Sequence, residues 1–169
     1  MITEKLLMGA MPGLSKGHVR MMVAPWYIGQ FVMTWAKHER MLADMLSRIR
    51  QCDYEVLRDR LLDSQIAAYE TEIRKTIADL GTSHPSTPYL TAVVEEHVKL
   101  RGFRNDIVHG FWSALGPDGE FQLKRKPRKG DDTMRVLSLE ELEQGWTKLD
   151  SLGVTVLNAS RAFEGKPIL

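Results

Sequence analysis

The stretch TPYLTAVVEEHVKLRGFRNDIVH, residues 87–109, carries the clearest structural pattern in the chain. Thr87 followed by Pro88 is typical of the cap and first residue of a helix, and Gly110 is typical of the residue just past a helix end. Apolar residues recur in this stretch at the spacing of one helix face, namely Leu90, Val93, Val94 and Val108. The stretch therefore predicts an amphipathic helix that ends at His109.

The apolar face of this predicted helix also carries His97, Arg101 and Arg104. In the same way, Glu39 falls within the apolar face of the helical pattern at residues 31–50. Burying an isolated charge is costly, so these groups must be paired or face water or a ligand. One interpretation is an ion pair in which Glu39 holds an arginine and fixes helix register. The other is a polar cleft that binds phosphate, and the two are compatible because a paired glutamate can orient a working arginine.

Three more segments have the period of amphipathic helices, residues 31–50, 54–80 and 139–157. Asp53 is placed to cap the second of them, Gly81 to end it, and Ser138-Leu-Glu-Glu141 to form a capping box before the third. Short amphipathic helices of this kind pack as bundles.

The remaining segments predict less regular structure. Residues 111–126 predict a β-hairpin around the turn Gly116-Pro117-Asp118-Gly119, and residues 1–29 predict an N-terminal arm or short helix. The expected fold class is thus all-α, with an up-and-down bundle of four to five helices over residues 30–169. The small β-hairpin is inserted between the last two helices.

Composition excludes several classes of protein. The 169 residues suit one domain, and 23 basic against 22 acidic residues give a net charge of +1, without the global positive charge of a histone-like protein. The single cysteine, Cys52, allows no intramolecular disulfide, and the five histidines lack metal-ligand spacing, so neither metal nor cofactor is expected. No apolar run approaches membrane-spanning length. We expect a cytoplasmic protein with no membrane partner.

The predicted helix 87–109 ends in Arg104-Asn105-Asp106-Ile107-Val108-His109. A histidine can serve as base or acid near neutral pH, and an arginine fork can bind phosphate oxygens and stabilise their transition-state charge. Asn105, four residues before His109, is placed to position the imidazole. Arg101 is a candidate phosphate contact. A basic stretch adds further candidate phosphate contacts, namely Lys124, Arg125, Lys126, Arg128 and Lys129.

In these residues the chain resembles the HEPN superfamily, small helical bundles with an Arg-polar-x-x-x-His signature near the end of a late helix. Arg104, Asn105 and His109 match that signature, and the resemblance covers about residues 30–163. It implies a metal-independent endoribonuclease of toxin or defence type, with Arg104, His109 and Asn105 as catalytic residues and with Glu39 and His97 in structural or orienting roles. Some toxin members carry a tyrosine two residues after the histidine, where the antitoxin modifies it. Phe111 stands there in this chain, so that mode of control is not expected.

Residues 104 and 109 are about 140° apart on an ideal helix, so we expect the two side chains not to converge within one chain. HEPN domains commonly dimerise through this helix, and the resemblance therefore implies a homodimer with a composite Arg/His cleft. RNA is the expected substrate, and an antitoxin or nucleotidyltransferase is a candidate partner. Two alternatives remain open: a non-catalytic subunit that binds nucleic acid, nucleotide or a partner, and a purely structural dimer with a buried charge network.

Overall fold

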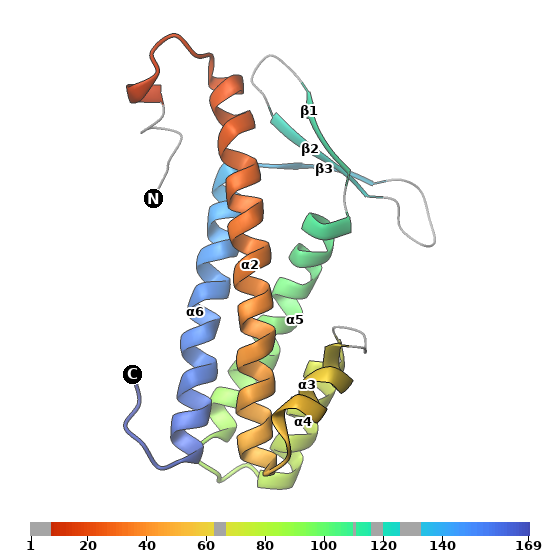
Figure 1. The fold of residues 1–169 in the computed structure, drawn as a ribbon, viewed down its shortest axis with the longest axis vertical. Coiled ribbons are helices and arrows are strands. Elements are labelled where there is room, and N and C mark those ends of the chain that lie inside the picture. The colour runs from red at the N-terminus through yellow and green to blue at the C-terminus, as the bar shows by residue number, and fades with distance from the viewer. Residues whose placement is uncertain (1–7, 63–66, 110, 116–119, 126–132) are drawn as a thin grey trace. The chain divides into compact units, whose positions relative to one another are not determined.

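The computed structural model describes residues 8–62, 67–109, 111–115, 120–125 and 133–169 (Figure 1). It contains the helices α2 (Lys16–Arg50), α3 (Tyr54–Leu62), α4 (Ala67–Leu80), α5 (Thr87–His109) and α6 (Leu139–Phe163). The strands are β1 (Phe111–Leu115), β2 (Glu120–Arg125) and β3 (Thr133–Leu137). No helix in the described part of the chain has the length and hydropathy that crossing a membrane requires.

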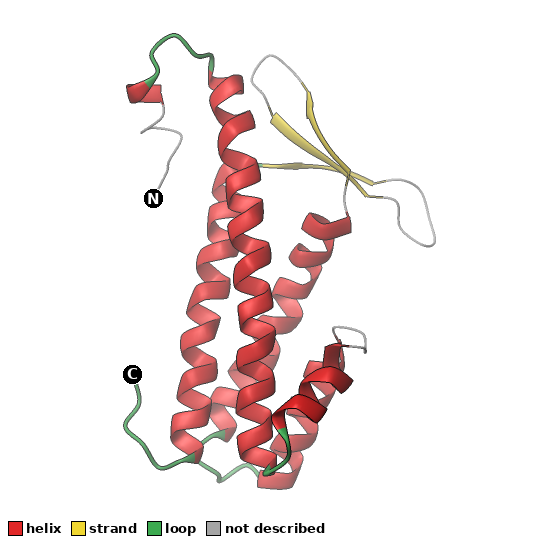
Figure 2. Ribbon diagram, in the orientation of Figure 1, coloured by secondary structure: helices red, strands yellow, loops and turns green. Residues whose placement is uncertain are grey.

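The chain forms two compact units, and α2, α5 and α6 each contribute to both. The sheet unit comprises residues 1–33 and 103–147, and the helical unit comprises residues 34–102 and 148–169. All three described strands belong to the sheet unit, whereas the described part of the helical unit consists of helices and loops (Figure 2).

The helical unit confirms the predicted helical bundle. Its core is formed by buried apolar side chains from each of its long helices, including Leu42, Leu46, Ile73, Leu90 and Leu149. The backbone N–H of Val56 donates to Asp53 Oδ1 over 3.0 Å, which confirms the predicted cap of α3. Gly81, with a φ of 80°, ends α4 in the left-handed conformation that glycine adopts freely. The helix expected over residues 54–80 is described as two helices, α3 and α4, and residues 63–66 lie outside the described residues.

The sheet unit contains three antiparallel strands in the order β1-β2-β3. Trp112 lies opposite Leu123 in the first pair of strands, and Leu123 lies opposite Arg135 in the second. The structure therefore adds a third strand, β3, to the pair of strands expected here, while the helical bundle of the expected fold class is confirmed. The third strand pairs with the second edge of β2, an edge that a hairpin alone would leave open. The expected turn at residues 116–119 lies outside the described residues.

Helix α2 begins at Lys16, so the expected start at residue 31 was wrong. The expected boundary between the arm and the bundle, at residues 29 and 30, lies inside this helix. Pro25 deprives one turn of a backbone hydrogen bond, but the buried side chains of Val19, Val23, Tyr27 and Phe31 keep one face packed through it. Packing of this face outweighs the local cost of the proline.

The two strongest local signals in the sequence are confirmed. Helix α5 covers Thr87–His109, as its flanking residues predict. At the start of α6, the Ser138 N–H donates to Glu141 Oε2 over 2.9 Å, and the Glu141 N–H donates to Ser138 Oγ over 3.1 Å. These two bonds are the capping box that the sequence predicts.

Candidate functional site

The predicted catalytic pair lies at the C-terminal end of α5, in the sheet unit. Arg104 Nη1 is 3.3 Å from His109 Nε2; the guanidinium is half-buried and the imidazole is exposed. Because arginine can only donate hydrogen bonds, Nε2 must accept in this contact. An accepting Nε2 places the ring proton on Nδ1.

This contact corrects the expectation that the two side chains do not converge within one chain. The angle of about 140° describes where the Cα–Cβ bonds point on an ideal helix. This angle does not take account of the length of the arginine side chain. The Arg104 side chain reaches along the last helical turn to the imidazole. A second copy is therefore not needed to bring Arg104 and His109 together.

Asn105 contacts the arginine instead of the histidine. Arg104 Nη1 donates to Asn105 Oδ1 over 3.4 Å. Among the described residues no hydrogen bond joins Asn105 to His109, so the predicted contact with the imidazole is not made. One guanidinium nitrogen thus lies between an amide oxygen and an imidazole nitrogen, which leaves Nη2 and Nε of Arg104 without a partner among the described residues.

The basic stretch lies mostly outside the described residues. Lys124 and Arg125 are the last two residues of β2, where their backbones lie opposite Met134 and Thr133 of β3. Lys126, Arg128 and Lys129 fall in residues 126–132, which lie outside the described residues. Contact between this stretch and an RNA backbone therefore remains a prediction.

Arg101 and His97 meet a carboxylate in the helical unit. His97 Nδ1 and Arg101 Nη1 are each 3.1 Å from an oxygen of Glu70, which projects from α4. His97 is fully buried and Glu70 is 8% exposed, so two helices share a buried ionic contact. Arg101, a candidate phosphate contact, therefore forms an ion pair with Glu70 of the same chain. Glu70 could have been found in the sequence, because it precedes Ile73 by three residues and Ile77 by seven on the apolar face of its helix.

Glu39 belongs to the same cluster through Trp35. The indole Nε1 of Trp35 donates to Glu39 Oε1 over 2.8 Å, one helical turn along α2. The Trp35 ring lies 5.0 Å from the ring of His97. The negative charge of Glu39 adds to the effect of burial, and together they raise the pKa of Tyr69. Glu39 thus contacts an aromatic side chain, and the orienting role expected for it stays a prediction.

A second buried histidine, His38, stacks on His97 with ring centres 5.7 Å apart and an angle of 26° between the planes. Burial, reinforced by the neighbouring His97, lowers the pKa of His38 to about 3. Burial also lowers the pKa of His97; the Glu70 contact opposes this and the Arg101 charge adds to it. Both imidazoles are therefore neutral near pH 7. His38 was missed in the sequence although it falls three residues after Trp35 and four before Leu42, on the same apolar face.

Comparison of the chain with protein-family models, curated proteins and solved structures found no match. The resemblance to HEPN proteins therefore depends on the motif residues themselves. Within the described residues, no group of three or more His, Cys, Asp or Glu side chains is placed to hold a metal ion.

Proposed function

We propose that this chain is an HEPN-like, metal-independent endoribonuclease of toxin or defence type that acts as a homodimer. The observation that supports this most directly is the 3.3 Å contact between Arg104 Nη1 and His109 Nε2 at the accessible end of α5. It joins a phosphate-binding cation to an imidazole that presents an acceptor nitrogen, the two groups that cleavage of RNA by its own 2′-OH requires.

In the proposed reaction, the RNA phosphate binds Arg104, which turns away from His109 and leaves Nε2 unoccupied. Nε2 then takes the proton of the 2′-OH while the oxygen attacks phosphorus. The P–O5′ bond breaks, and an acid donates a proton to the leaving oxygen. The products are a 2′,3′-cyclic phosphate and a 5′-OH. Arg104 stabilises the extra negative charge on the phosphate oxygens in the transition state.

The homodimer follows from the need for an acid. One imidazole that has taken the 2′-OH proton cannot at the same moment protonate the leaving oxygen on the opposite side of phosphorus. A second His109, from the partner copy, would supply that proton in a composite cleft. This proposal assigns the dimer a chemical reason, since Arg104 and His109 already meet within one chain.

The direct test is RNA cleavage in EDTA by the full chain and by the variants Arg104→Ala and His109→Ala. We expect each variant to lose at least about 100-fold in rate, and the wild-type products to carry 2′,3′-cyclic ends. His18→Ala is the matched control, because His18 is also exposed and hydrogen-bonded to a neighbour, Ser15, at 2.7 Å. It should cleave at the wild-type rate.

The homodimer has its own test in the same assay. Wild-type and His109→Ala chains are refolded together at several ratios, and sedimentation confirms the dimer. If both imidazoles act in one cleft, the rate per total protein falls as the square of the wild-type fraction. A linear fall would refute the composite cleft. RNA that is bound but never cut would replace the proposal with a non-catalytic nucleic-acid-binding subunit.

A further inference from the structure

His38, in the helical unit, is a buried side chain whose polar atoms have no partner in the described structure. It is 1% exposed, and neither Nδ1 nor Nε2 has a hydrogen-bond partner. An unpaired buried polar group costs folding free energy, and polar groups in protein cores nearly always have a partner. A water molecule or ligand on the imidazole would supply one.

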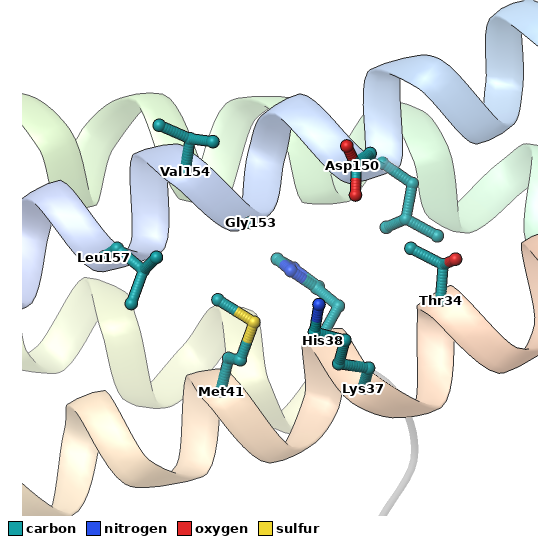
Figure 3. Close-up of a pocket in the computed structure, with 9 residues that line it drawn as sticks. Thr34, Lys37, His38, Met41, Asp150, Gly153, Val154 and Leu157 are labelled. Carbon is teal, nitrogen blue, oxygen red and sulfur yellow. The ribbon is translucent and has the colours of Figure 1, made fainter. Parts of the chain in front are cut away.

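A pocket of about 120 Å³ lies over this side chain, between the C-terminal half of α2 and residues 149–157 in the middle of α6 (Figure 3). His38 lines it together with Met41 of the same helix and with the aliphatic side chains Leu149, Val154 and Leu157 of α6. Thr34, Lys37 and Asp150 supply polar groups around this apolar wall. The pocket thus offers a mostly apolar surface beside an imidazole whose two nitrogens are unpaired and covered, so an occupant reaches them only when a neighbouring side chain moves.

Gly153 shapes the wall of the pocket. A methyl group built on its Cα would lie 3.6 Å from Met41 Cε and 3.9 Å from Met41 Sδ, which is ordinary van der Waals contact. Any larger side chain at this position would project into the space beside Met41. The missing side chain therefore preserves the volume, and Met41 is a flexible side chain that can move to admit a ligand.

Water alone is a poor occupant. About 120 Å³ corresponds to roughly four water molecules, and each ordered water needs two or more polar partners. The apolar wall does not supply them. An apolar cavity of about 150 Å³ can hold a benzene ring, so a single six-membered ring with part of it at the opening suits this size.

We propose that the pocket over His38 binds a small, neutral, ring-sized molecule with a hydroxyl group that hydrogen-bonds to the imidazole. A neutral imidazole presents one donor and one acceptor nitrogen, and a hydroxyl can meet either of them. The aliphatic wall disfavours a permanent charge deep in the pocket. This site is independent of the Arg104–His109 pair and does not depend on ribonuclease activity.

The test uses phenol and toluene, two probes of nearly the same size of which only phenol carries a hydroxyl. Binding to the full chain is measured by titration calorimetry and by NMR shifts of the pocket residues. We expect phenol to bind about tenfold more tightly than toluene, the value of one hydrogen bond. In His38→Leu, the affinity for phenol should fall to the affinity for toluene. In Gly153→Leu, neither probe should bind.

Two variants keep the result interpretable. His18→Leu makes the same chemical change at an exposed histidine and should bind both probes like the wild type. Gly153→Ala narrows the pocket, and its methyl makes only ordinary van der Waals contact with Met41. This variant should stay folded and should bind both probes more weakly than the wild type. Equal binding of phenol and toluene, unchanged phenol binding in His38→Leu, or no binding of either probe to the wild type would each overturn the proposal.

Discussion

The buried imidazole of His38 predicts how the stability of the chain falls in acid. Its pKa is held near 3 in the folded state, by burial and then by the neighbouring His97, against an ordinary value of 6.5. Between these two values, the unfolded chain binds a proton that the folded chain does not bind. The free energy of unfolding therefore decreases as pH falls below 6.5, and this loss is complete near pH 3.

The magnitude follows from the size of the shift. Each pH unit in this window costs about 1.4 kcal/mol, so acidification from about pH 6.5 to about pH 4.5 should cost roughly 2–3 kcal/mol through His38 alone. This is a large part of the 5–15 kcal/mol that typically stabilises a domain. Burial lowers the pKa of His97 as well, which adds a contribution of the same sign.

The assay is urea denaturation followed by tryptophan fluorescence, at several pH values from about 7.5 to about 4.5, on the wild type and on His38→Leu. Trp35 lies 6.3 Å from the His38 ring and reports on this region. Because the other titrating groups are common to both chains, their effects cancel in the difference. We expect the difference in free energy of unfolding between His38→Leu and the wild type to shift in favour of His38→Leu by about 1.4 kcal/mol for each pH unit below 6.5. Parallel pH profiles for the two chains would show that His38 is not a buried neutral imidazole, and the reasoning would fail.

Other predictions concern stability at neutral pH. Glu70→Ala should cost about 3 kcal/mol in urea denaturation, because it leaves a buried imidazole and a guanidinium without their carboxylate, and Glu70→Gln should cost less. Gly145→Ala should lower the free energy of unfolding by about 1–2 kcal/mol, because its methyl would overlap a ring carbon of Phe103. Gly153→Ala should raise the free energy of unfolding by up to about 1 kcal/mol, because alanine has a higher helix propensity than glycine. Ser138→Ala should cost about 1 kcal/mol in thermal unfolding through loss of the capping box.

The helix ends that the sequence predicts correctly are those set by local chemistry. The Thr87-Pro88 start, the Gly81 end and the Ser138 capping box each depend on atoms within a few residues of one another, so their outcome needs no knowledge of the tertiary fold. The start of α2 is different. Pro25 and the glycines near it argue locally against a helix, and burial of the Val19–Phe31 face overrides them. That burial is a property of the whole unit and cannot be read from the segment.

The candidate site shows a similar division. Helical periodicity correctly places His97 on the buried face of α5, and the same test finds Glu70 and His38 when it is applied to every helix. Which carboxylate meets Arg101 could not be predicted, because it depends on the packing of α4 against α5. The contact between Arg104 and His109 was missed for another reason. Side-chain reach, and not the angle between Cα positions, decides whether two residues on one helix can touch.

The two arginines on α5 differ in what their contacts can contribute to folding. The Arg101 contact joins a buried carboxylate that also holds a fully buried histidine, so breaking it leaves charge in the core and must be costly. The Arg104 contact with His109 lies at an exposed helix end, where such pairs contribute less than about 1 kcal/mol. Arg104→Ala should therefore unfold at nearly the wild-type urea concentration. A loss of RNA cleavage in that variant would then report a lost chemical step and not a lost fold, whereas a strong loss of stability would move Arg104 from the proposed catalytic pair to the structural network.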